Sequence, residues 1–298
     1  MALFPHHDWA DADGLESPDP ALAATGYFHH DPDSHSRRLR RCHEVLWSKK
    51  LPDGRGLSLR PDGSGLRDTD TNEYLSSDAA IPAWEQWSEV QSFHAETQHR
   101  LQDAGRGTVH DLGWRLYDMG GFVLFPGCQV DGRWTINQAK GCIRSIADRL
   151  DLALECIRLY YAFLRERTEE TVSLPDGYDR VNPLGSVLHR YRRFFEVFGS
   201  FEGYVNFWLL DDLVSEGESG LQVNFLLPRS SSGPYDFSLE AALPVDGDEY
   251  CAYLIAADDF VDKRNRRMAQ ELAPLRPGND ICPACLGCGG KEHRRGWR

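Results

Sequence analysis

Apolar positions recur every three or four residues over much of the second half of the chain, which is the period of an amphipathic helix. This period predicts helices over residues 136–167, 183–198, 204–214 and 248–271. In the first half, Trp84, Trp87, Val90 and Phe93 show similar spacing after the polar cluster 76–78. Ser and Asp are preferred helix N-caps, so this cluster is expected to begin a helix that ends near Gly105.

Shorter apolar runs between turn residues predict strands. The run GLSL lies between two Pro-Asp-Gly turns, which favours a hairpin or an exposed loop over residues 50–70. Further strands are expected at 114–117, 122–125 and 221–227. The expected class is therefore α+β: a helix-dominated single domain with a small antiparallel or mixed sheet in its first half.

The same patterns divide the chain into three parts. Residues 1–26 contain acids, Ala, Pro and His without a period, and are expected to form an irregular lead. Residues 27–271 carry the predicted elements and form the principal α+β domain. Residues 272–298 form a basic tail that contains Cys and His.

The composition of the 298 residues is that of a water-soluble chain, with 41% hydrophobic residues and a mean hydropathy of −0.50. The longest apolar runs, FVLF and FWLL, are much shorter than the roughly 18–20 residues that cross a bilayer. The first residues lack the basic and apolar regions of a secretory signal. We therefore expect a cytoplasmic protein, without a membrane partner, whose eight Cys are thiols.

The charge is unevenly distributed along the chain. The net charge of −13 argues against a general nucleic-acid coat, because phosphate binding depends on Lys and Arg. From Lys263 onwards, nine basic and three acidic residues give a net charge of +6, which leaves −19 for the first 262 residues. The basic tail is expected either to pack on the acidic body or to bind a separate anionic partner.

Several blocks of residues resemble a bacterial domain-of-unknown-function family. They include DPDSHSRRLRRCHEVLWSKKLPDG, YLSSDAAI, GGFVLFPGCQVDGRWTINQAKG, IADRLDLALECIRLYY and FEGYVNFWLLDDLV. The resemblance covers about residues 27–267, and departs from the family pattern at Cys42, where the family has Tyr, and at Lys140, where it has Arg. It implies membership of an uncharacterised family and no particular activity.

A charged stripe is the most informative feature of the predicted helix 143–161. Five residues spaced by four, three, four and three positions lie in a strip about 80° wide between apolar banks. They are Arg144, Asp148, Asp151, Glu155 and Arg158. The stripe is interpreted as a buried ion network, as the floor of a polar cleft, or as a solvated face.

If the stripe lines a cleft, its residues would divide the chemistry between them. Asp148, Asp151 or Glu155 would act as general base or ligate a divalent cation, and Arg144 and Arg158 would bind an anionic substrate.

The basic block near the N-terminus offers a second group of candidates. Arg40, His43 and Trp47 share one helical face, with Lys49 close by in sequence. An Arg, a His and an aromatic ring together are able to hold a nucleotide base and its phosphate, and His43 would serve as a second acid or base. The alternative is that the block is a basic cover over the acidic body.

Two residues at expected helix starts are lesser candidates. Ser77 lies in the predicted cap at 76–78, where backbone N–H groups are also able to hold an anion. Asn137 follows Thr135 in a TIN segment that is typical of turn and cap chemistry.

The tail contains a possible metal site. Cys282, Cys285, Cys288 and His293 supply four zinc-compatible ligands within twelve residues. A zinc site of this kind would be closed and structural. A free tail and an iron–sulfur site are the alternatives, although the latter normally takes a fourth Cys.

Two functions remain open at this point. The first is an enzyme acting on a small anionic, nucleotide-like substrate between the basic block and the stripe. The second is a non-catalytic binding or regulatory protein in which the stripe is a structural ion network. The enzyme hypothesis requires His43 and Asp148 to share one pocket, and the oligomeric state is left open.

Overall fold

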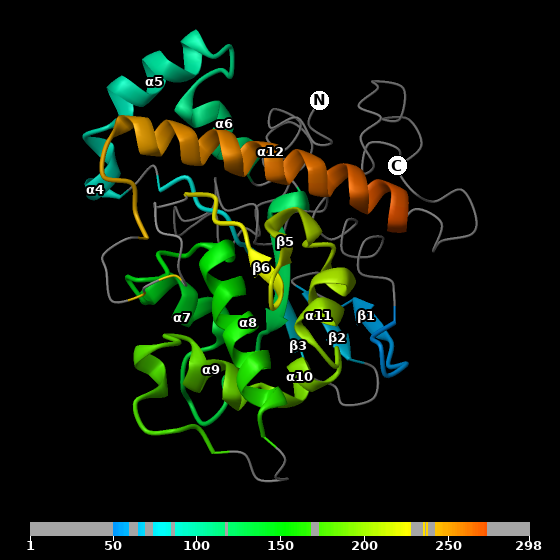
Figure 1. Ribbon diagram of the computed structural model, residues 1–298. Helices are drawn as coiled ribbons and strands as arrows, with labels where there is room; N and C mark the ends of the chain where they lie inside the picture. Colours follow the sequence, from blue (N-terminus) through cyan, green and yellow to red (C-terminus); the bar gives the residue numbers. More distant parts are fainter. Residues whose placement is uncertain are drawn as a thin grey trace, which may run out of the picture.

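The computed structural model describes residues 50–59, 65–68, 74–84, 87–116, 119–167, 173–227, 235, 237 and 242–272. Within these ranges the chain forms a helix-dominated α+β fold with a small antiparallel sheet, as expected (Figure 1). No helix in this part of the chain is long and apolar enough to span a bilayer.

The main sheet has four strands in the order β1-β2-β3-β4, and every neighbouring pair is antiparallel. Its strands are β1 (Leu57–Leu59), β2 (Gly65–Asp68), β3 (Tyr74–Ala79) and β4 (Phe122–Pro126). Of the two alternatives predicted for residues 50–70, a hairpin or an exposed loop, the pairing of β1 with β2 confirms the hairpin. A second hairpin pairs β5 (Val214–Gly217) with β6 (Gly220–Val223), in the region of the strand predicted at 221–227.

The helices follow the predicted segments with several breaks. The α-helices are α4 (Ser88–Gln91), α5 (His94–Asp103), α6 (Val109–Arg115), α7 (Ile136–Cys142), α8 (Leu150–Arg165), α9 (Gly185–Arg190), α10 (Arg192–Glu196), α11 (Phe201–Trp208) and α12 (Gly247–Leu272). Short 3₁₀ turns are η2 (Met119–Gly121), η3 (Tyr178–Arg180) and η4 (Asp211–Leu213).

Two local predictions in the first half are wrong. The cluster 76–78 lies inside β3, where Ser77 pairs with Leu124, and does not cap a helix. Trp114 and Arg115 belong to α6, although a strand was expected there. The start of α6 is capped by reciprocal bonds between Thr108 and Asp111. The backbone N–H of Asp111 donates to the Thr108 hydroxyl, and the Thr108 N–H donates to the Asp111 carboxylate.

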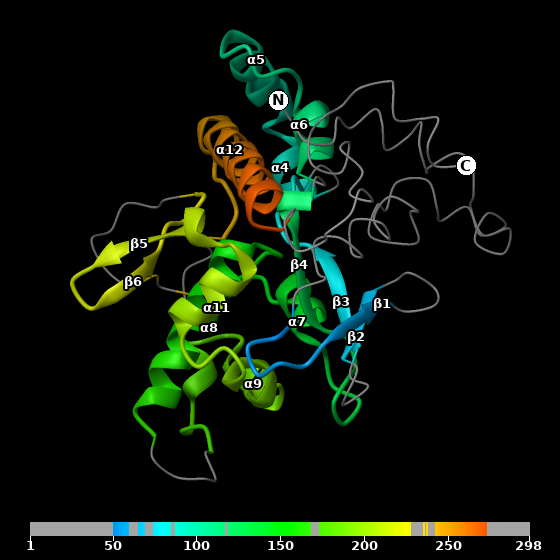
Figure 2. The same ribbon diagram turned by 90° about the vertical axis from the view of Figure 1, so that its right-hand side faces the viewer.

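Helix α8 lies at the centre of the part of the molecule that is drawn below α12 in Figure 1. Its residues from Leu150 to Ile157 are all buried, and Figure 2 shows α7, α8 and α11 between the four-stranded sheet and the β5–β6 hairpin. Tyr161, Phe195 and Tyr204 form part of a connected aromatic cluster around α8, α10 and α11. Burial of these large rings supplies much of the apolar area that stabilises the fold.

Helix α12 spans the molecule above α8 and packs against α5, α6 and the η2 turn (Figure 1). Its 26 residues correspond to about 39 Å. Gly120 allows a close approach here, since a Cβ atom on it would lie 2.3 Å from the Val261 carbonyl oxygen of α12.

Arg264 fixes α12 to the body from a fully buried position. Its guanidinium donates hydrogen bonds to the carbonyls of Gly120 (2.7 Å), Phe122 (2.6 Å), Trp208 (2.9 Å) and Leu209 (3.2 Å). Burial lowers the pKa of Arg264 to about 9, so the group is still protonated at neutral pH. The four carbonyls satisfy this buried cation, which therefore joins α12 to β4 and to the end of α11.

Candidate functional site: paired charges around α8 and a surface hollow

The predicted single helix over 143–161 is wrong, and the charged stripe does not lie on one helical face. Helix α7 ends at Cys142 and α8 begins at Leu150, so Arg144 and Asp148 lie in the loop between them. This loop has positive φ angles at Ala147 (48°) and Asp148 (65°).

The break in the helix is held by bonds to other parts of the fold. The N–H of Asp148 donates to the Lys140 carbonyl at 3.0 Å, and the N–H of Leu150 donates to the Ala80 carbonyl at 2.8 Å. The indole N–H of Trp84 donates to the Ala147 carbonyl at 2.9 Å, and Trp84 itself has a positive φ of 54°. These contacts stabilise a conformation that non-glycine residues seldom adopt.

Asp148 is paired with Lys140. The Lys140 ammonium is fully buried, contacts the Asp148 carboxylate and also donates to the Asp148 carbonyl at 2.8 Å. The Asp148 side chain is 31% exposed, which makes it the most accessible of the three predicted catalytic carboxylates.

Asp151 is paired with Arg149, and both side chains are fully buried. The Arg149 Nε donates to Asp151 Oδ1 at 3.0 Å, and Arg149 Nη2 contacts Oδ2. Oδ2 also accepts the backbone N–H of Leu226 at 2.8 Å, while Arg149 Nη1 donates to the Ala242 carbonyl at 2.8 Å. Burial is the largest single influence and acts to lower the pKa of Arg149, but the attraction and hydrogen bonds of Asp151, together with Tyr253 and Tyr235, outweigh it and raise the pKa.

Glu155 is paired with Arg158 one turn further along α8. Two parallel bonds of 2.7 Å join Arg158 Nε and Nη2 to Glu155 Oε2 and Oε1. Glu155 is almost completely buried, and Arg158 is one-quarter exposed. The hydrogen bonds that Arg158 donates to Glu155 outweigh the effect of burial and raise the pKa of Arg158.

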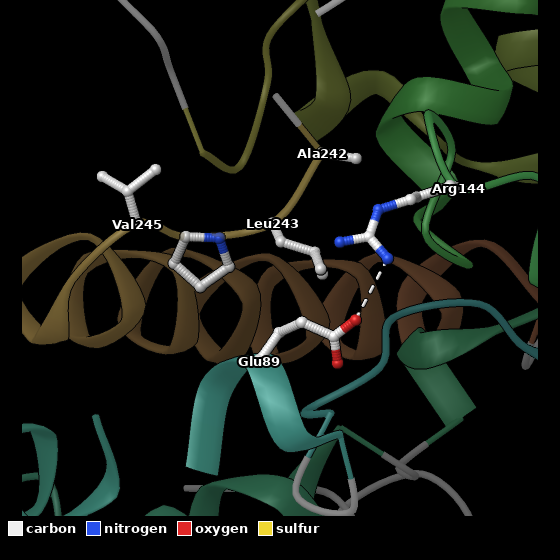
Figure 3. Close-up of a pocket in the computed structure, with 6 residues that line it drawn as sticks. Glu89, Arg144, Ala242, Leu243 and Val245 are labelled. Carbon is white, nitrogen blue, oxygen red and sulfur yellow. Dashed lines mark hydrogen bonds and ion pairs between the residues drawn. The ribbon is translucent and has the colours of Figure 1, made fainter. Parts of the chain in front are cut away.

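Arg144 lies apart from these pairs, on the edge of a surface hollow (Figure 3). Its Nη1 donates to Glu89 Oε1 of α4 at 3.1 Å, across the space between the loop and α4. The hollow has a volume of about 130 Å³ and is lined by Glu89, Arg144 and residues 242–245.

Two further predicted site residues, Asn137 and Ser77, do not line this hollow. Asn137 lies in the first turn of α7, and the predicted cap chemistry there is confirmed. The Thr135 hydroxyl accepts the Gln138 N–H at 3.2 Å, and the Gln138 side chain accepts the Thr135 N–H at 3.0 Å. Ser77 lies in β3, with only its backbone described.

Two predicted groups fall outside the described residues. These are the basic block with Arg40, His43, Trp47 and Lys49, and the tail with Cys282, Cys285, Cys288 and His293. The shared pocket of His43 and Asp148 and the zinc site therefore stay predictions. Among the described side chains, no group of three or more His, Cys, Asp or Glu is arranged to hold a metal ion.

Sequence reasoning included Arg158, the partner of Glu155, but missed the partners of Asp148 and Asp151. Lys140 stood out only as a departure from the family pattern, and a continuous helix over 143–161 gives neither Lys140 nor Arg149 a place in the stripe. The signal that could have revealed Arg149 is its position two residues before Asp151, at the start of an apolar run. Glu89 gave no signal, since its pairing with Arg144 joins residues 55 positions apart.

The fold and its paired charges define a helix-rich α+β protein. The chain belongs to a family of unknown function, DUF6994, whose model matches residues 22–268. This confirms the family resemblance of the sequence blocks. No curated protein and no solved structure matches the chain.

Proposed function

We propose that this protein is a non-catalytic binding or regulatory protein in which the charges from Lys140 to Arg158 form a structural ion network. The observation that carries the proposal is that each predicted catalytic carboxylate has its own cation. Asp148, Asp151 and Glu155 contact Lys140, Arg149 and Arg158, respectively.

The geometry leaves little room for catalysis by two of these carboxylates. A general base must reach the substrate proton, and a cation ligand must offer free lone pairs. Both Asp151 oxygens accept bonds from Arg149, and both Glu155 oxygens accept bonds from Arg158. These groups therefore support the fold better than they support a reaction.

The network also connects segments that are far apart in the sequence. The Arg149–Asp151 pair bonds to the backbone of Leu226 and Ala242, and Lys140 joins α7 to the loop before α8. Such buried pairs add little to stability compared with an apolar core, but breaking one by removing a single partner is costly. This asymmetry provides a direct test.

The test is the thermal midpoint of the Asp148→Asn, Glu155→Gln double variant in metal-free buffer, with far-UV circular dichroism to check folding. A structural network predicts a fall of several degrees, because Lys140 and Arg158 would lose their counter-charges. Asp131→Asn and Glu218→Gln, at exposed turn positions, are the matched controls and should leave the midpoint unchanged. A midpoint that holds or rises in the double variant would contradict the proposal.

The second candidate is the enzyme acting on a small anionic substrate. One observation favours it: Asp148 is partly exposed beside the buried ammonium of Lys140, so it is able to meet a ligand. If the double variant keeps its midpoint, screening nucleotides and divalent cations against the wild type is the next measurement.

The proposal includes a cytoplasmic location. Cys128 and Cys142 are exposed thiols in the described structure. Exposed thiols persist most readily in a reducing compartment, which supports this part of the proposal.

A further inference from the structure

The hollow beside Arg144 combines two opposite charges with an apolar wall. Figure 3 shows Glu89 and Arg144 extending toward each other from α4 and from the loop before α8, with Leu243 beside them. Pro244 and Val245 continue the wall, and Val245 is 59% exposed, which is unusual for a large apolar side chain in this fold.

The side chains of Arg144 and Glu89 are both accessible to a ligand, and their bond to each other occupies only part of their hydrogen-bonding capacity. Arg144 is 60% exposed and Glu89 38% exposed. A guanidinium has five N–H donors, and in the described structure Arg144 uses one of them, toward Glu89 Oε1. The Glu89 pKa is lowered by its own backbone N–H, by the Ser88 hydroxyl and by Arg144, so the carboxylate is ionised at neutral pH.

The walls of the hollow are fixed from behind. The Ala242 carbonyl accepts a bond from the buried Arg149 guanidinium, and the loop that carries Arg144 is held by the bond from Trp84 to Ala147. Trp84 and Ala147 both keep positive φ angles, which persist only where the surroundings impose them. A site held in this way needs little reorganisation when a ligand binds.

We propose that this hollow binds a small zwitterion, an α-amino acid with a short aliphatic side chain. The ligand carboxylate binds the unused edge of Arg144, its ammonium group binds Glu89, and its side chain packs against Leu243 and Val245. The inference rests on the proposed binding function and adds the class of ligand.

Charge spacing and size select this class. Arg144 Nη1 and Glu89 Oε1 lie 3.1 Å apart, so a ligand that meets both must carry its two charged groups close together, as an α-amino acid does on its single Cα atom. A cavity of about 150 Å³ accepts a six-carbon ring, so the volume of about 130 Å³ suits a ligand of the size of valine. A paired Arg and Glu also gives no net attraction for a simple anion.

The test is isothermal titration calorimetry of the full chain with L-valine. Valinamide, which lacks the negative charge, and N-acetylvaline, which lacks the positive charge, are the matched ligands. The proposal predicts saturable binding of L-valine and at least about tenfold weaker binding of both analogues, because each loses one charge-assisted contact.

Variants locate the binding. Arg144→Gln and Glu89→Gln should each weaken L-valine binding by about tenfold or more. Arg133→Gln and Glu202→Gln, at exposed positions outside the hollow, make the same charge changes and should leave it unchanged. No saturable binding of L-valine, equal binding of N-acetylvaline, or binding unaffected by Arg144→Gln would each overturn the inference.

This result is separable from the test of the structural network. A fall in the midpoint of the Asp148→Asn, Glu155→Gln variant together with no valine binding would overturn the ligand and keep the network. An unchanged midpoint would overturn the network whatever valine does.

Discussion

Arg149 and Asp151 lie two residues apart, are both fully buried, and bond to each other through two guanidinium nitrogens and both carboxylate oxygens. Arg149 is the N-cap residue of α8 and has an extended backbone, while Asp151 lies in the first turn of that helix. The negative charge thus meets the positive end of the helix dipole as well as the arginine. The start of α8 is therefore held both by the arginine and by the helix dipole.

Removing the charge of Asp151 should destabilise the protein. Asp151→Asn leaves the Arg149 guanidinium buried without a counter-charge, which costs about 3–5 kcal/mol for a pair of this kind. The free energy of unfolding, measured by urea denaturation, should fall by that amount. Asp131→Asn, at an exposed turn, is the control, and equal stability of the two variants would show that the buried pair contributes nothing.

Arg264 offers a second test, because its contacts depend on the fork shape of the guanidinium. It donates to four carbonyls from three nitrogens, whereas Lys has one nitrogen with three donors. Arg264→Lys therefore leaves buried carbonyls unpaired and should lower stability by about 2–4 kcal/mol. Arg266→Lys, on the exposed face of the same helix, should change the thermal midpoint by little. Similar midpoints for the two variants would contradict this role.

Asp258 is a buried carboxyl group of α12. We expect its contribution to the free energy of unfolding to depend on pH with the opposite sign to that of most carboxylates. Burial, together with the repulsion of Asp259 and Asp262, raises its pKa above the usual Asp value and outweighs the attraction of Arg115 and Arg106. The folded chain then binds a proton more readily than the unfolded chain. The contribution of Asp258 to stability is thus most favourable below the unfolded pKa and falls as the pH rises through the folded pKa.

The measurement compares Asp258→Asn with the wild type across this window. The variant resembles the protonated carboxyl group, so its free energy of unfolding should rise relative to the wild type as the pH increases above the usual Asp pKa of about 4. Asp259→Asn, its more exposed neighbour, is the control. A relative loss of stability in Asp258→Asn as the pH rises would show that the ion pairs outweigh burial.

Features that depend on neighbours in sequence could be predicted. The helix expected over 248–271 is α12, the hairpin expected over 50–70 forms from β1 and β2, and the cap at Thr135 begins α7. In each case residues within a few positions supply the period, the turn or the capping bonds. Local sequence therefore determined the class of the fold and most of its helices.

Features that depend on distant residues could not be predicted. Ser and Asp at 76–78 have the composition of a helix cap, but pairing with β4, more than forty residues later, makes them a strand. The period over 143–161 is helical, yet bonds to the carbonyls of Lys140 and Ala80 and a bond from the Trp84 indole stop the chain from forming one helix there.

The candidate site divides in the same way. The sequence by itself determined that three acidic and four basic residues are interspersed between 140 and 158 and that the chain has the motifs of its family. Only the tertiary structure decided that these charges pair with one another inside the fold, and that Arg144 meets Glu89 at a surface hollow. The physical reason is that pairing of charges depends on burial and on contacts between distant segments, which residue spacing does not contain.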